Sequence, residues 1–79
     1  MHFVYVLKRK DGELYIGYTS DLKRRITEHE KDYKCKLIYY ESYEIEALAR
    51  NREKRLKYYG SAWRGLKKRI GLEGGVRKL

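Results

Sequence analysis

The sequence predicts a small α/β domain whose strands and helices follow in the order β-β-α-β-α-α. Short runs of β-branched and aromatic residues alternate with longer stretches whose apolar residues recur at helical spacing. The chain has 79 residues, enough for one domain with a thin core, because a short chain buries a smaller fraction of its surface than a long one. We expect one domain over residues 1–72 and a flexible tail over residues 73–79.

The first two strands are expected to form a hairpin. "FVYVLK" at residues 3–8 and "LYIGYT" at residues 14–19 have the composition and length of strands. They are joined through "RKDGE", in which Asp11-Gly12 is a strong turn signal.

The length of the hairpin loop decides which side chains share a face of the sheet. A three-residue loop with Gly12 in the left-handed conformation pairs Arg9 with Glu13. Tyr5 and Tyr15 then lie on one face, because side chains alternate between the faces along each strand. A two-residue turn would place the two tyrosines on opposite faces.

A helix follows the hairpin and ends at about Asp32. Thr19 or Ser20 can cap its N-terminus, and Asp21 favours its first turn. Arg25 falls on the inward stripe of this helix, which is unusual because a helix does not normally direct a guanidinium towards a core. The apolar face is predicted to consist of Leu22, Ile26, His29 and Tyr33.

A third strand and two helices complete the predicted order. "KLIYYESY" at residues 36–43 has the length of a strand, and its three tyrosines argue against a helix. A helix begins at Glu44 and is ended by Gly60. "SAWRGLKKRI" is a short final helix anchored by Trp63 and Leu66. The apolar side of the helix that begins at Glu44 is predicted to carry Ile45, Leu48, Ala49, Leu56 and Tyr59, and its arginines and lysines, Arg52 among them, are predicted on the opposite side.

The positive charge lies almost entirely in the C-terminal part of the chain. Residues 1–49 contain nine Lys/Arg and nine Asp/Glu, whereas residues 50–79 contain eleven Lys/Arg against only Glu53 and Glu73. A one-sided basic field attracts polyanions, of which nucleic acid is the commonest inside cells. The same charges also fit a solvated Lys/Arg surface that keeps a small protein soluble, and charge alone does not decide between the two.

The cysteine content and the hydropathy favour a cytoplasmic protein. Cys35 is the single cysteine, so an internal disulfide is excluded. No run approaches the roughly 18 apolar residues of a membrane span. The N-terminal "MHFVYVLKRK" has too short an apolar part for a secretory signal and is better interpreted as the first strand.

Four side chains form a candidate site for phosphodiester hydrolysis. Tyr5 and Tyr15 are expected on adjacent strands, and Arg25 and His29 lie one helical turn apart. An arginine can stabilise charge on a pentavalent phosphate, a histidine can bind phosphate or move a proton, and a phenol near cations can act as a general base. Each residue also has a structural interpretation: packed tyrosines, a histidine in the core, and an arginine whose head reaches solvent.

Glu53 is a second candidate, because it is an isolated carboxylate within a basic segment. It lies in "NREKRLK", and i, i+4 spacing places it in the row of Ile45 and Ala49 at the edge of the buried face. Such a carboxylate should stay ionised and can hold one divalent metal ion. The residues alone favour the other interpretation, an ion pair with Arg50 or Lys57 on the helix surface.

These segments resemble the GIY-YIG nuclease domain, in particular the small stand-alone bacterial proteins similar to the N-terminal nuclease module of the excision-repair incision subunit. The resemblance rests on "FVY", "YIG", "DLKRRITEH" and "ALARNREKRLK" in this order, and it covers residues 3 to about 70. It implies a three-stranded antiparallel sheet flanked by helices. Phe3 stands where the first motif has a glycine, and the connection "EKDYKCK" is shorter than in most members of the family.

The resemblance also implies a role for each matched residue. Tyr5 or Tyr15 is expected to activate water, with Tyr5 as the preferred base. Arg25 and His29 are expected to hold the scissile phosphate, and Glu53 to bind Mg²⁺ or Mn²⁺. A single acid suits a one-metal mechanism. The matched positions are Tyr5, Tyr15, Gly17, Arg25, His29 and Glu53.

We therefore expect a metal-dependent DNA endonuclease with a role in DNA repair or recombination. The main alternative is a nucleic-acid-binding module that keeps the fold but does not cleave, whereas an interaction protein without a nucleic-acid role explains the net charge of +9 poorly. No membrane partner is expected, and a homodimer or a partner protein stays open as the source of specificity. The residues expected to contact DNA are Arg24, Lys57, Arg64, Lys67 and Lys68.

Overall fold

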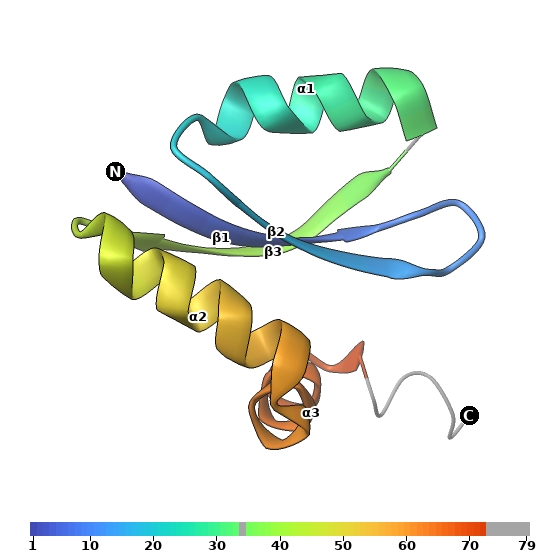
Figure 1. Cartoon of the computed structure of the whole chain (residues 1–79). Helices are drawn as coiled ribbons and strands as arrows, with labels where there is room; N and C mark the ends of the chain where they lie inside the picture. The colour runs from blue at the N-terminus through green and yellow to red at the C-terminus, as the bar shows by residue number, and fades with distance from the viewer. Residues whose placement is uncertain (34, 73–79) are drawn as a thin grey trace.

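The computed structural model describes residues 1–33 and 35–72, and the predicted tail, residues 73–79, lies outside them. Within the described residues one antiparallel sheet has the strand order β2-β1-β3. Helix α1 covers one face of this sheet, and α2 and α3 lie on the other side (Figure 1). The predicted fold and element order are confirmed. The elements are β1 (His2–Lys8), β2 (Leu14–Thr19), α1 (Leu22–Tyr33), β3 (Lys36–Tyr43), α2 (Glu46–Tyr58) and α3 (Gly60–Arg69).

The β1–β2 hairpin has a three-residue loop, one of the two loop lengths that the sequence left open. The Arg9 N–H donates to the carbonyl oxygen of Glu13 over 2.8 Å, and Gly12 has a φ of 93°, which a residue with a side chain rarely adopts. In the resulting register Leu7 lies opposite Tyr15, so Tyr5 and Tyr15 share a face, as expected for a three-residue loop.

The central strand β1 is buried on both faces, which divides the core in two. Val4 and Val6 face α2 and α3, where the buried residues Ala49, Leu56 and Leu66 complete one cluster. Tyr5 and Leu7 face α1 together with Cys35, and Leu22, Ile26 and Leu37 pack against them. Because the two faces alternate along β1, a single strand organises both layers of the molecule.

The N-terminus of α1 differs from the prediction that Thr19 or Ser20 caps it. Asp21 is the capping residue, because its Oδ1 accepts a hydrogen bond from the Arg24 N–H over 3.1 Å. Thr19 is buried, and its Oγ1 accepts from the N–H of Asp21 over 3.0 Å instead. The predicted packing of the Tyr33 side chain lies outside the described part of the chain.

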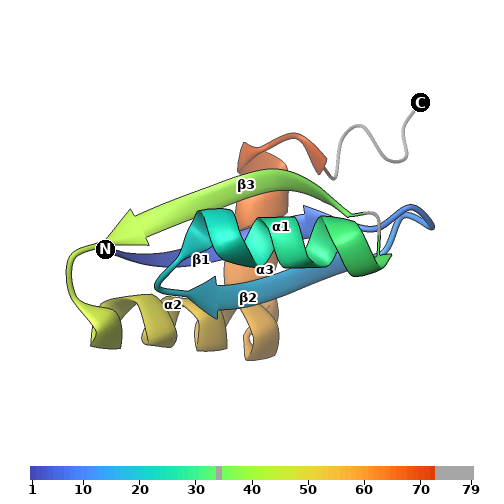
Figure 2. The same cartoon turned by 90° about the horizontal axis from the view of Figure 1, so that it is seen from above.

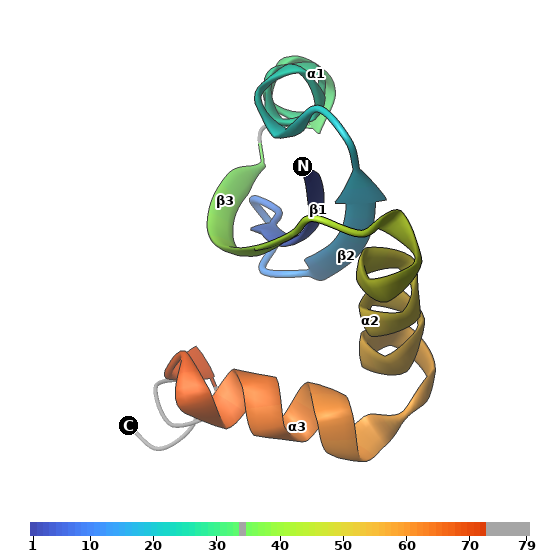
Figure 3. The same ribbon diagram turned by 90° about the vertical axis from the view of Figure 1, so that its left-hand side faces the viewer.

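Two predictions about α2 and α3 are wrong. Gly60 does not end α2 but begins α3, and the extended Tyr59 separates the helices. Ile45, Leu48 and Tyr59 are more than half exposed. The reason is that α2 follows the β2 side of the sheet (Figure 2, Figure 3), so only a narrow stripe of it is covered. None of the helices in the described ranges is long and apolar enough to span a membrane.

Candidate active site

The centre of the candidate site is Tyr5, whose ring crosses β2 at a glycine. Tyr5 lies on β1 and is 3% exposed, and Gly17 is its partner on β2. A Cβ atom added to Gly17 would overlap Cζ and Oη of Tyr5 and would lie 2.9 Å from its Cε1. The phenol therefore reaches over the edge strand only because position 17 has no side chain.

Helix α1 brings His29 between the two tyrosines. The Tyr5 Oη and the His29 Nε2 lie 3.5 Å apart, at the long end of the hydrogen-bonding range. The Tyr15 ring meets the imidazole edge-on, with ring centroids 5.7 Å apart and planes at 89°. Tyr15 is 50% exposed, so this side of the site is open to solvent.

Arg25 contributes a positive charge beside the Tyr5 phenol. Its side chain is 39% exposed, but its Nε is buried and has no hydrogen-bond acceptor among the described residues. The Glu28 Oε1 lies 3.5 Å from this nitrogen, in an ion pair that does not have hydrogen-bond geometry. Burial raises the pKa of Tyr5, and the charge and hydrogen bond of Arg25 oppose that rise without cancelling it. The inward stripe of α1 thus places a guanidinium beside the buried phenol.

Glu53 approaches the same phenol from α2, on the other side of the sheet edge. Its negative charge is one of the influences that raise the pKa of Tyr5. The side chain is 20% exposed, and its Oε2 forms an ion pair of 2.9 Å with the Lys57 Nζ. The hydrogen bond to Glu53 raises the pKa of Lys57. The ion pair expected from the residues alone is therefore present, and it coexists with a position beside Tyr5.

The donor set around Glu53 suits a hard divalent cation that keeps most of its water. A carboxylate oxygen is the ligand that Mg²⁺ prefers, and Mg²⁺ is usually bound by one or two carboxylates plus water and phosphate oxygens. No cluster of three or more His, Cys, Asp and Glu side chains occurs within residues 1–33 and 35–72. Glu53 is thus the group at this site that would hold such an ion, in competition with the Lys57 ammonium.

The residues predicted to contact DNA do not all lie on one surface. Arg24 is on the outer surface of α1, within 4.0 Å of the carboxylates of Asp21 and Glu28. The other four residues lie on α2 and α3, across the sheet from α1 (Figure 1). The structure therefore groups four of the five predicted contacts on the α2–α3 side, namely Lys57, Arg64, Lys67 and Lys68.

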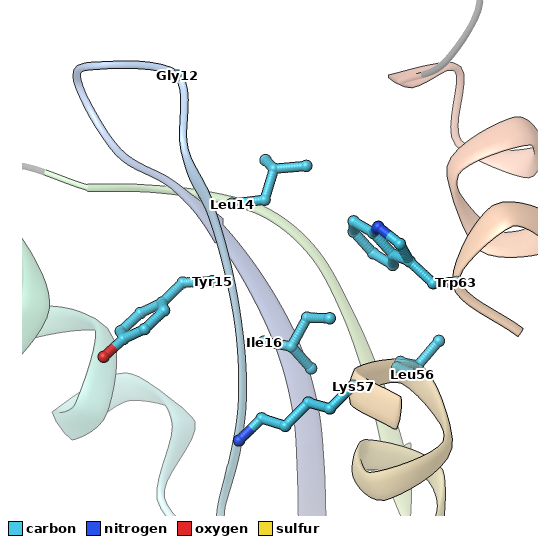
Figure 4. Close-up of a pocket in the computed structure, with 7 residues that line it drawn as sticks. All are labelled: Gly12, Leu14, Tyr15, Ile16, Leu56, Lys57 and Trp63. Carbon is cyan, nitrogen blue, oxygen red and sulfur yellow. The ribbon is translucent and has the colours of Figure 1, made fainter. Parts of the chain in front are cut away.

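An open groove adjoins the site between β2 and the two C-terminal helices. It encloses about 530 Å³. The Trp63 indole extends from α3 towards Leu14 and Ile16, whereas Tyr15 points from β2 towards α1 (Figure 4). The sequence predicted Trp63 as an anchor of the last helix, which is confirmed by its packing against the core, but it did not reveal this groove.

A polar network that the sequence did not predict joins α2 to β3. The Glu41 carboxylate accepts hydrogen bonds of 2.6 Å from both Tyr39 and Tyr43, and the Arg52 Nε donates to it over 3.0 Å. Arg52 was expected with the other basic residues on the solvent side of α2, and this is wrong. The alternation of Tyr39, Glu41 and Tyr43 was the available signal, because it places three polar groups on one face of a strand. The network helps to set the orientation of the helix that carries Glu53.

Comparison with known proteins agrees with the fold and with the family resemblance of the sequence. Residues 1–57 match the family model of the GIY-YIG catalytic domain. The chain is 37% identical to UPF0213 proteins of Staphylococcus aureus strains Mu50 and N315, over 73% of this chain and 82% of each relative. The solution structure of the UPF0213 protein BH0048 from Bacillus halodurans has a TM-score of 0.59 and 31% identity, and the match covers 95% of this chain and 87% of that one. The chain therefore belongs to the GIY-YIG domain family.

Proposed function

We propose that the protein is a DNA endonuclease that hydrolyses phosphodiester bonds with one divalent metal ion, Mg²⁺ or Mn²⁺. The observation that supports this function best is the convergence of different groups on one buried phenol. Arg25 and His29 reach Tyr5 from α1, and the charge of Glu53 acts on it from α2. The site thus combines a cation, an imidazole, a phenol and a carboxylate at an edge that is open to solvent. These groups suit the hydrolysis of a phosphodiester bond in a long polymer.

Tyr5 is proposed as the group that activates water. Burial raises its pKa, so the phenol needs neighbours that stabilise the phenolate before it can accept a proton at neutral pH. The His29 Nε2, 3.5 Å away, can take the phenolic proton, and Arg25 supplies a compensating positive charge. Tyr15 is the less suitable base, because it is half exposed and meets His29 through the edge of its ring.

Arg25 is proposed to bind a non-bridging oxygen of the scissile phosphate. Its buried Nε lacks a hydrogen-bond acceptor among the described residues, and a guanidinium fits two phosphate oxygens at once. Negative charge on these oxygens increases as water attacks. Arg25 therefore stabilises the transition state more strongly than the bound substrate.

Glu53 is proposed to hold the metal ion. Bound there, a divalent ion would act as a Lewis acid that stabilises negative charge on the phosphate and the leaving oxygen. Glu53 supplies the anionic ligand, and Lys57 keeps the carboxylate oriented through its 2.9 Å contact with Oε2. When the ion enters, the Lys57 ammonium is expected to move away from Glu53 towards a DNA phosphate, because the two cations repel each other.

The test is metal-dependent cleavage by the wild type and by Glu53→Gln. The screen uses nicked, forked, four-way and single-stranded DNA with Mg²⁺ or Mn²⁺. Glu53→Gln keeps the shape of the side chain but removes its charge, so it should fold normally and lose Mg²⁺-dependent cleavage, with at most partial rescue by Mn²⁺. Its DNA affinity should not fall, because a charge that repels phosphate is gone.

Glu46→Gln is the matched control. Glu46 forms the same i, i+4 ion pair on the same helix, with its Oε2 2.7 Å from the Arg50 Nε, and it is not part of the site. This variant should cleave like the wild type. Full nicking by Glu53→Gln at ordinary Mg²⁺ concentrations would exclude Glu53 as the metal ligand.

A binding module that does not cleave is the second candidate. The observation that favours it is the ion pair with Lys57, which already neutralises Glu53. Under this alternative the wild type binds DNA in a salt-dependent way but nicks no DNA with either metal ion. The same screen therefore separates the two functions.

A further inference from the structure

Of the residues that line the groove between β2 and α2–α3, Lys57 also has a part in the hydrolysis proposed above, where it is paired with Glu53. The groove opens next to Tyr15 (Figure 4). Its volume of about 530 Å³ lies within the roughly 300–1,000 Å³ of small-molecule sites. Leu14 and Ile16 from β2 and Leu56 from α2 give it apolar walls. The Trp63 indole extends across the groove from α3.

Positive charges lie at the rim of this apolar groove. The Lys57 ammonium reaches along Ile16 to β2, the strand that carries Tyr15 (Figure 4). The Lys67 Nζ lies over the Trp63 ring, 5.7 Å from its centroid, so a base that stacks on this face takes the place of the ammonium. An aromatic ring beside an apolar groove, with ammonium groups near it, has the chemistry that recognises a nucleotide. The planar base stacks on the ring, and the phosphates pair with the cations.

We propose that the groove binds an unpaired nucleobase by stacking on Trp63, while the phosphate of a neighbouring nucleotide lies at Tyr5. This inference rests on the proposed function and names the class of substrate: DNA with an unpaired nucleotide beside the scissile bond. A base inside an intact duplex is stacked between its neighbours and must leave the helix before it can enter a groove on a protein. The site is therefore selective for frayed, displaced or single-stranded segments.

The fluorescence of Trp63 tests the proposal directly, because the chain contains one tryptophan. The intact protein is titrated in metal-free buffer with a thymidine oligonucleotide of about twelve nucleotides, a length that fits single-strand binding sites. Two polyanions without bases serve as probes of charge alone: an oligonucleotide of the same length in which every site is abasic, and heparin. Anisotropy of labelled probes, with unlabelled heparin as a competitor, measures binding independently.

We expect the thymidine oligonucleotide to quench Trp63 strongly and both base-free polyanions to bind with little quenching. Equal quenching by all three probes would overturn the proposal, because the indole would then report charge rather than stacking. Binding of the thymidine oligonucleotide without quenching, or no binding of it, would also overturn it. Cleavage is measured separately with Mg²⁺, so quenching without cleavage would refute the proposed nuclease and retain the base site.

Trp63→Leu and Tyr58→Leu form a matched pair of variants. Trp63→Leu keeps an apolar side chain for packing but removes the stacking surface, so it should weaken binding of the thymidine oligonucleotide by about tenfold and leave heparin binding unchanged. Tyr58 is 74% exposed and lies outside the groove, so Tyr58→Leu should bind the oligonucleotide like the wild type. An equal loss for both polyanions in Trp63→Leu, with the fold intact by circular dichroism, would contradict the stacking role.

Discussion

Gly17→Ala is expected to disable the site without replacing any residue proposed to do chemistry. The Cβ of an alanine at position 17 would overlap Cζ and Oη of Tyr5. Tyr5 is buried beneath α1, so its ring cannot swing into solvent and must shift against the residues packed around it. The substitution therefore moves the phenol away from His29 and Arg25.

The size of the effect follows from this overlap. Restoring van der Waals contact requires a shift of about 1 Å, and a misplacement of that size costs on the order of 10²-fold in rate. Forcing an extra methyl group into a packed core costs about 1–3 kcal/mol in the free energy of unfolding. Gly65→Ala is the control, because nothing lies within 4 Å of a Cβ built there. It should raise stability by about 0.5–1 kcal/mol, since Gly65 lies in the interior of α3.

The assay combines urea unfolding with the Mg²⁺-dependent cleavage rate of each variant. A double-mutant cycle on stability isolates the clash, because Gly17→Ala should cost little once Tyr5→Ala has removed the ring. Wild-type stability and cleavage in Gly17→Ala would show that the phenol does not depend on the glycine. A coupling free energy near zero in the cycle would place the cause of any destabilisation elsewhere.

Three further predictions concern charge. Arg25→Ala should lower the cleavage rate roughly 10²-fold or more with little change in stability. If the variant instead unfolds but keeps its activity per folded molecule, Arg25 has a structural role and no catalytic one. In a plot of log affinity against log salt concentration, each contact with a duplex phosphate contributes a slope of about −0.9. Neutralising Lys67 and Lys68 together should therefore make this slope less steep in anisotropy titrations. An unchanged slope would show that DNA binds to another surface. Burial raises the pKa of Glu41, but the hydrogen bonds that it accepts outweigh this and lower the pKa overall, whereas burial and the bond to Glu41 raise the pKa of Tyr43 to about 12. Melting curves should therefore show stability lost as pH falls through the lowered pKa of Glu41 and again as pH rises from 10 towards 12. Glu41→Gln should reduce the loss at acid pH, part of which remains because the Arg50 hydrogen bond lowers the pKa of Glu46 as well.

The site was predictable where short-range rules decide it. The Asp11-Gly12 pair indicated a turn but left open whether the loop has two or three residues. The three-residue loop of the structure, together with the alternation of strand side chains, places Tyr5 and Tyr15 on one face. One helical turn separates Arg25 from His29, so both were expected on the same stripe. These relations depend on backbone geometry within a few residues, and the structure reproduces them.

The orientation of α2 was not predictable in this way. Helical periodicity indicates which residues share a stripe, but it does not say which stripe the sheet covers when several are partly apolar. Ile45 and Leu48 were expected in the core and are exposed, whereas Arg52, expected in solvent, is paired with Glu41. The rotation of the helix depends on packing and polar contacts with β3, a strand distant in the sequence.

The sequence by itself determined the order of strands and helices, the position of the hairpin turn, and the basic charge of the C-terminal part. It left open the length of the hairpin loop, and with it the face that carries Tyr15. Only the tertiary structure decided that the Tyr5 phenol crosses β2 at Gly17, that the charge of Glu53 acts on this phenol, and that Trp63 extends over a groove beside Tyr15. The physical reason is the range of the interactions. Turn geometry and side-chain alternation act between neighbouring residues. The positions of α2 and α3 at the edge of the sheet depend instead on packing and polar contacts throughout the chain, which no local sequence pattern encodes.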